Sequence, residues 1–182
     1  MPRLAPLDLK NLTPEQNEVA ESIIAGPRGG LRGPFEAWLR SPLFADRAER
    51  LGEYCRFHNA LPHDLSELAI ILTGKHWKAQ FEFWAHARLA REAGISSEVI
   101  EAIRTGGKPP FAREPERIVY DFLTEYFATN RVSDANYQRA IAEFGEQGVV
   151  DLIGVVGYYG LVSMTLNVFE TPLPPGQPEP LP

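Results

Sequence analysis

Glutamate, histidine and lysine side chains gather in one short stretch of this sequence, between Glu67 and His86. Glu82 and His86 are four residues apart and therefore share one face of a helix, which Lys78 extends by another turn. A carboxylate next to an imidazole can hold and transfer a proton near neutral pH, because histidine titrates in that range. We therefore predict that His86, Glu82 and Glu67 form a catalytic acid–base group.

This prediction depends on a bend in the chain between the two glutamates. Asp64 can cap a helix with Glu67 at the third position, and apolar residues follow at helical spacing as far as Gly74. A second helix is expected from Lys75 to Ala93. In one unbroken helix, Glu67 and His86 would lie about 100° apart around the axis. Gly74 must therefore permit a turn if the two side chains are to meet.

The same polar residues also fit a purely structural interpretation. Glu67 can be the capping-box partner of Asp64. Glu82 and His86 can be a surface pair that contributes a few tenths of a kcal/mol (~0.2–0.5) to helix stability. Residue types alone do not decide between a working site and a structural polar pair.

Two further alternatives concern neighbouring residues. Trp77 and Trp84 are seven residues apart and fit the core of a helical bundle. His76, Glu82 and His86 could together ligate a metal ion, but their spacing matches no recognised ligand motif. We therefore predict neither a metal nor a cofactor.

The composition limits the class of protein. A chain of 182 residues is typical of one domain, and its net charge of −6 argues against non-specific nucleic-acid binding. The single cysteine, Cys55, excludes an internal disulfide and a C-x-x-C redox pair. The opening residues, MPRLAPLDLK, lack the apolar core of a signal peptide, so we expect a cytoplasmic location.

One segment, Val149 to Phe169, is apolar and long enough to cross a bilayer. Asp151 and Asn167 lie inside it and no basic cluster flanks it, so we predict a buried helix and no membrane association. Small residues on one side of this helix would let another helix approach closely, either in the core or between subunits. They are Gly154, Gly157, Gly160 and Ser163.

The overall pattern predicts an all-α, single-domain bundle of about eight helices. No segment alternates apolar and polar residues as a half-buried strand would. We expect an irregular arm over residues 1–12, a helical core over 13–170 and an extended proline-rich tail over 171–182. The glycine-rich loop 26–34, GPRGGLRGP, carries two arginines and is either a flexible connection or an anion-binding loop.

Four stretches carry a resemblance to a known family. They are RGPFEAWLRSPLFADRAERLGEYCRF, ELAIILTGKHWKAQFEFWAHARLAREAGIS, YDFLTEYFATNRVSDANY and FGEQGVVDLIGVVGYYGLVSMTLNVF. The most specific feature is Glu67-x18-His86 with a Trp-x6-Trp pair between them. Over most of residues 32–169 the chain resembles the carboxymuconolactone decarboxylase family, within the alkylhydroperoxidase-D-like superfamily.

The resemblance favours one branch of that superfamily. Its peroxidase branch has a C-x-x-C pair between the glutamate and the histidine, and counting from Glu67 places those two positions at Ala79 and Glu82. Dithiol peroxidase chemistry is therefore disfavoured. The decarboxylase branch carries an acidic residue where Glu82 stands. That branch implies a cofactor-free homo-oligomer, a trimer or a hexamer, acting on small anionic lactones from aromatic-acid breakdown.

In this interpretation His86 is the acid that protonates carbon, and Glu82 or Glu67 orients it. The side chains that we expect to contact the substrate are His76, Lys78, Trp77, Trp84, Tyr158 and Tyr159. The first two would attract the substrate's carboxylate and the rest would form apolar walls. The alternatives are a peroxidase-type or other small-molecule enzyme on the same fold, and a non-catalytic helical oligomer with a structural polar cluster.

Overall fold

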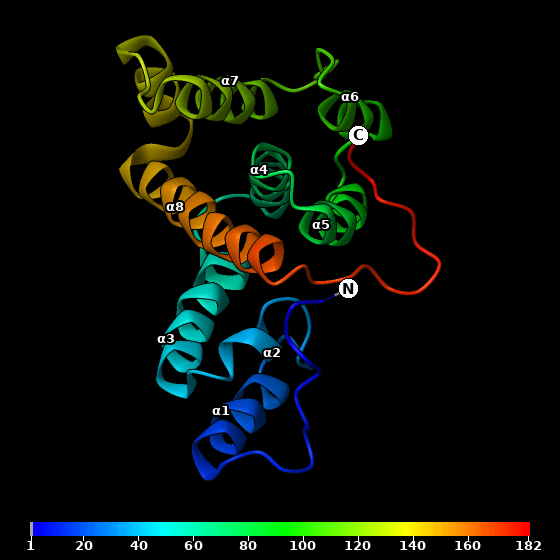
Figure 1. Ribbon diagram of the computed structural model, residues 1–182. Coiled ribbons are helices and arrows are strands. Elements are labelled where there is room, and N and C mark those ends of the chain that lie inside the picture. Colours follow the sequence, from blue (N-terminus) through cyan, green and yellow to red (C-terminus); the bar gives the residue numbers. More distant parts are fainter. Residues whose placement is uncertain (1) are drawn as a thin grey trace.

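The structure, a computed structural model, describes residues 2–182, and in that range it contains helices and no strand (Figure 1). This confirms the predicted all-α fold. The α-helices are α1 (Pro14–Ala25), α2 (Phe35–Trp38), α3 (Pro42–Glu53), α4 (His63–His76), α5 (Gln80–Glu92), α6 (Ser97–Thr105), α7 (Glu114–Thr129) and α8 (Asp134–Val168). A π-helix, η1 (Tyr54–His58), continues α3.

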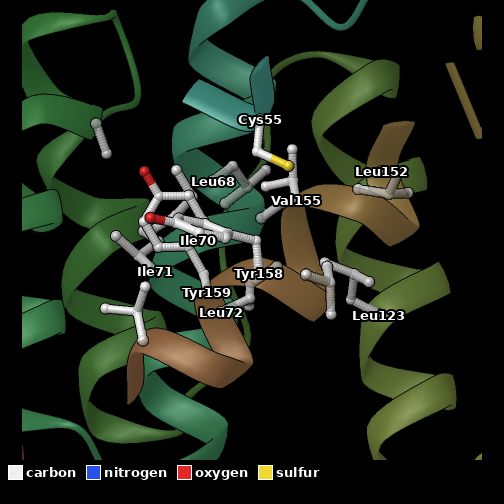
Figure 2. Close-up of a cluster of buried hydrophobic side chains, with 14 of the residues drawn as sticks. Cys55, Leu68, Ile70, Ile71, Leu72, Leu123, Leu152, Val155, Tyr158 and Tyr159 are labelled. Atoms are coloured by element: carbon white, nitrogen blue, oxygen red, sulfur yellow. The ribbon is translucent and has the colours of Figure 1, made fainter. Parts of the chain in front are cut away.

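Helix α4 lies at the centre of the bundle, between α5, α7 and α8 (Figure 1). Every residue from Leu65 to Gly74 is buried, so this helix has no solvent-facing side. In Figure 2 its apolar side chains Leu68 to Leu72 lie beside Val155 and Tyr158 of α8 and Leu123 of α7. A polar residue inside α4 therefore needs a partner from a neighbouring helix.

Helix starts follow the local signals in the sequence. Thr13 and Gln16 form a reciprocal capping box at the start of α1. Ser96 and Ser133 accept hydrogen bonds from the first turns of α6 and α8. Gly106 ends α6 in the left-handed conformation, with φ of 78°.

The expected capping box at the start of α4 is wrong. The helix begins at His63 after Pro62, which makes no side-chain cap. The Asp64 carboxylate instead pairs with Arg113, and Glu67 is buried in the bundle. Glu67 is therefore not a capping residue.

The expected break at Gly74 is also wrong, because α4 continues to His76 and α5 begins at Gln80 rather than Lys75. The turn lies at 77–79, where Lys78 adopts a left-handed backbone with φ of 52°. Gly74 lies inside α4 and faces α5. A Cβ atom there would lie 3.4 Å from the backbone nitrogen of Phe83, which is ordinary van der Waals contact, so the packing of α5 on α4 does not require glycine at this position.

The helix predicted from Val149 is the later part of a longer helix, α8, which is kinked at Gly145 with φ of 68°. By length and composition α8 could cross a membrane, yet 67% of its most apolar window is buried inside the bundle, as predicted for a core helix. Gly160 allows a close contact within the core, because its Cβ would lie 3.3 Å from Nε1 of Trp77. Gly157 faces open space.

Apolar side chains remain exposed along the outer side of α8. They are Val150, Ile153, Met164 and Val168, the first of them 69% exposed. These residues recur at helical spacing and lie on the same side as Gly157. We expect this stripe to be covered by a second copy of the chain.

Sedimentation velocity at micromolar concentration tests this expectation. The wild-type chain should sediment above its monomer mass of 20.3 kDa. Ile153→Glu combined with Met164→Glu should shift it to the monomer, because carboxylates at a contact are costly to desolvate. Gln138→Glu, on the part of α8 before the kink, is the matched charge control. A monomeric wild type contradicts the expectation.

Candidate active site

The three residues predicted to form an acid–base group meet inside the bundle. Nδ1 of His86 donates to Oε2 of Glu67 at 2.7 Å, which joins α5 to α4. Nε2 of His86 lies 3.1 Å from Oε1 of Glu82, one helical turn earlier on α5. The relative exposure of Glu67, Glu82 and His86 is 1%, 4% and 6%. The imidazole is therefore held between two buried carboxylates.

The two contacts of the imidazole differ in kind. The contact with Glu67 has the geometry of a hydrogen bond, and it fixes the orientation of the ring. The contact with Glu82 is within ion-pair distance but lacks hydrogen-bond alignment, so Oε1 of Glu82 has no hydrogen-bond partner in residues 2–182. A poorly aligned contact is a weak hydrogen bond, even at a short distance. Glu82 Oε1 is therefore free to accept a proton or a ligand.

Burial and charge act in opposite directions on this cluster. Burial lowers the pKa of His86, but the adjacent Glu67 and Glu82 carboxylates outweigh it and hold the pKa above its ordinary value of 6.5. Burial raises the pKa of Glu82 above 4.5, against the opposing influence of His86. Both shifts favour bound protons, so the cluster retains a proton at a pH where a free imidazole would lose it.

A cavity of about 730 Å³ opens beside His86 and Glu82. Glu67 does not line the cavity, so it supports the imidazole from behind. Trp84 of α5 and both Tyr158 and Tyr159 of α8 form part of the wall, as the sequence suggested. A cavity of this size suits a small organic molecule.

Three residues predicted to contact a substrate lie elsewhere. His76 is exposed and stacks on Phe127, with ring centroids 4.2 Å apart. The backbone carbonyl of Trp77 accepts a hydrogen bond from Asn167 at 2.7 Å, and Lys78 is exposed in the turn before α5. None of the three lines the cavity: His76 packs on α7, Trp77 lies against α8, and Lys78 is exposed.

The position of His76 also removes support for the metal alternative. Within the described range, no three histidine, cysteine, aspartate or glutamate side chains are grouped so that they could hold a metal ion. The two carboxylates beside His86 therefore have the imidazole as their common partner.

Five arginines line the cavity, and none of them is among the residues that the sequence predicts to contact a substrate. They are Arg28, Arg32, Arg40, Arg56 and Arg88. The first two belong to the glycine-rich loop 26–34, whose arginines were the available signal for an anion-binding loop. Arg56 comes from η1, and a π-helix is often found where a helix carries a functional residue. The cationic lining favours a negatively charged ligand.

The two ends of the chain close the cavity. Its lining includes Pro2 to Pro6 of the arm, apart from Arg3, and Thr171, Pro172 and Pro174 of the tail. Arg3 joins the two ends through an ion pair with Glu170 at 2.9 Å. The tail is held at its far end by Gln80, whose side chain makes two hydrogen bonds with the backbone of Leu181. The irregular arm and tail therefore shield the site from water.

Cys55 takes no part in this site. Its side chain is 1% exposed and does not line the cavity. Burial raises the pKa of the Cys55 thiol to about 11, so it stays protonated at neutral pH. The structure therefore offers no thiolate for dithiol chemistry.

The chain matches no family model and no curated protein sequence. Among solved structures it is similar to the debrominase Bmp8, whose structure is that of a cysteine-to-alanine variant in complex with 2,3,4-tribromopyrrole. The TM-score is 0.73 and the identity is 12%, and the match covers 93% of this chain and 90% of that chain. It is similar to an uncharacterized peroxidase-related protein from Silicibacter sp. TM1040, with a TM-score of 0.74, 12% identity and the same coverages of 93% and 90%.

These similarities concern the arrangement of helices. They confirm the expected alkylhydroperoxidase-D-like helical fold over nearly the whole chain. At 12% identity they do not transfer an activity, so the chemistry has to be argued from the site itself.

The pKa of His86 is directly measurable by NMR titration of the imidazole. We expect a value above 6.5, because two carboxylates flank the ring. Glu82→Gln should lower the pKa of His86, because one negative charge beside the imidazole is lost. Glu92 forms an ion pair with Arg88 on the surface of the same helix, so Glu92→Gln is the matched control. It should leave the pKa of His86 unchanged. An unchanged value in Glu82→Gln contradicts the electrostatic account.

Proposed function

We propose that this protein is a cofactor-independent acid–base enzyme that decarboxylates a small carboxylated lactone or a related acid. One observation carries the proposal: His86 is held between two buried carboxylates at the wall of a cavity lined with arginines. The resemblance of the Glu67-x18-His86 stretch to the carboxymuconolactone decarboxylase family supports the choice of reaction.

The arginines attract the anionic substrate, and the aromatic walls exclude water from its apolar body. As the bond between carbon and the carboxylate breaks, CO2 leaves and the electron pair moves into a conjugated carbonyl, which becomes an enolate. His86 then donates a proton to the carbon of that enolate. The product has gained one hydrogen at the protonated carbon and has lost CO2, and no electron acceptor or donor is consumed.

Each residue of the cluster has its own part in this step. Glu67 accepts from Nδ1 and holds the ring in one orientation, while its charge stabilises the imidazolium. The other nitrogen, Nε2, and Glu82 lie on the side of the cavity. After proton transfer, the carboxylate of Glu82 can return a proton to His86, because its pKa is raised.

A polar cluster that only stabilises the fold would differ in its hydrogen bonding. Buried polar networks that only stabilise a fold have all their members hydrogen-bonded. Here Oε1 of Glu82 is buried without such a partner, and it lies at a cavity. Peroxidase chemistry is not supported either, since Cys55 is protonated and outside the cavity.

A screen of the purified protein against carboxymuconolactone and related carboxylated lactones, followed by CO2 release, tests the proposed function. His86→Gln should lower turnover by about 10²–10⁴-fold, the usual contribution of a general acid. His58→Gln, an exposed histidine on η1, is the control and should remain active. A His86→Gln variant with full activity contradicts the assignment.

A parallel assay addresses thiol chemistry. Cys55→Ser should retain the decarboxylase activity in full, because the thiol neither ionises at neutral pH nor reaches the cavity. Hydroperoxide reduction with a thiol donor is measured on the wild type and on Cys55→Ser. Peroxide turnover that disappears in Cys55→Ser would replace the proposed function with a one-cysteine peroxidase.

A further inference from the structure

Buried polar atoms without partners are concentrated at this cavity. Within residues 2–182, four buried side-chain nitrogen or oxygen atoms have no hydrogen-bond partner: Nε of Arg28, Oε1 of Glu82, the hydroxyl of Tyr159 and Oγ of Ser163. The first three belong to residues that line the cavity. Proteins leave few such atoms unpaired, because each costs free energy. Their grouping therefore indicates a ligand that completes them.

The ring of Tyr159, whose hydroxyl is one of these unpaired atoms, lies against the ring of His86. The two rings meet edge to face with centroids 5.0 Å apart, and Tyr158 packs against Tyr159 at 5.2 Å. Figure 2 shows both tyrosine hydroxyls on the same side of α8, pointing away from Cys55. Burial raises the pKa of Tyr159 well above its ordinary value, so the hydroxyl remains protonated and can donate.

Arg28 supplies positive charge to the same wall. Its guanidinium lies over the rings of Phe35 and Phe57, at 5.1 and 5.8 Å, and makes only a long 3.5 Å contact with the Tyr158 hydroxyl. No carboxylate of the described chain forms an ion pair with it. A partly buried guanidinium that makes no direct ion pair favours an anion beside it.

The backbone makes room for this pair of side chains. A Cβ atom on Gly52 of α3 would lie 2.1 Å from the Tyr158 hydroxyl and 2.6 Å from Nη2 of Arg28. Neither distance is sterically allowed, so only glycine lets Arg28 and Tyr158 occupy their positions. The wall next to Tyr159 is thus built into the packing of α3 against α8.

Resting on the proposed function, we propose that Tyr159 is a catalytic residue whose hydroxyl donates a hydrogen bond to the substrate oxygen that becomes the enolate, with Arg28 balancing its charge. The electron pair released with CO2 ends on that oxygen, so a donor there lowers the barrier. His86 borders the ring of Tyr159, which places the proton donor and the oxyanion donor along one substrate.

This assignment defines the class of substrate more narrowly. The carbon that loses CO2 must be conjugated to a carbonyl, because only then can the electron pair reach an oxygen. Unsaturated carboxylated lactones and unsaturated keto acids meet this condition. Saturated carboxylic acids without a conjugated carbonyl do not, and we expect no turnover of them.

The test uses p-nitrophenolate, whose phenolate oxygen resembles an enolate, at a pH where it is ionised. Binding is followed by the change in its absorbance. Tyr159→Phe should bind it about 10–100-fold more weakly, since a hydrogen bond to a charged group is lost. Turnover of the conjugated substrate should fall about 10²–10³-fold. Arg28→Gln should also weaken probe binding.

Thermal unfolding separates catalysis from a structural role. The Tyr159 hydroxyl has no partner in the protein, so Tyr159→Phe should keep or raise the Tm. Tyr137→Phe, which removes an exposed hydroxyl on α8 outside the cavity, is the control for probe binding and turnover. Equal probe affinity in wild type and Tyr159→Phe overturns the proposal, and so does a lower Tm that accounts for the lost turnover.

The proposed function and the proposed role of Tyr159 are contradicted by different results. If probe binding depends on Tyr159 but the wild type releases no CO2 from any conjugated carboxylated lactone, the proposed function fails and the oxyanion subsite is supported. If CO2 is released and depends on His86, while Tyr159→Phe keeps full probe affinity and turnover, the proposed function is supported and the role of Tyr159 is wrong.

Discussion

A carboxylate buried in the central helix is the constraint on which much of this structure depends. Glu67 lies in a stretch of α4 in which every neighbour is buried, and it is itself 1% exposed. An unpaired charge in such a place costs on the order of several kcal/mol in desolvation. Within residues 2–182, His86 is the one side chain that pairs with it, at 2.7 Å. Helix α5 must therefore lie against α4 at one register, which the turn at 77–79 permits by reversing the chain.

The sequence was sufficient to predict that Glu67, Glu82 and His86 meet. It was not sufficient to predict where the chain turns between α4 and α5. The i,i+4 spacing of Glu82 and His86 is enough to place them on one helix face. The sequence predicts the turn at Gly74, whereas in the structure α4 runs through Gly74 to His76 and the turn places Lys78 in the left-handed region. Tertiary packing overrides local preference at both positions.

The cavity depends on contacts between distant parts of the chain, and such contacts leave little local signal. Arg28 and Arg56 reach the cavity from a loop and from a π-helix, while the arm and the tail are joined by Arg3 and Glu170, which are far apart in sequence. No helical period links these residues. Conversely, His76 and Lys78 are close to the cluster in sequence but lie outside the cavity, since His76 stacks on Phe127 of α7 and Lys78 is exposed.

The central claim is that His86 delivers a proton to the carbon of the enolate that forms when CO2 leaves. The most direct measurement is the reaction of carboxymuconolactone in D2O, with the product analysed by NMR. We expect one deuterium per product, at the carbon that the enolate protonates and with a single stereochemistry, because the proton comes from one fixed face of the cavity. Product with deuterium in equal amounts on both faces, or the same stereochemistry and rate in His86→Gln, would contradict the claim.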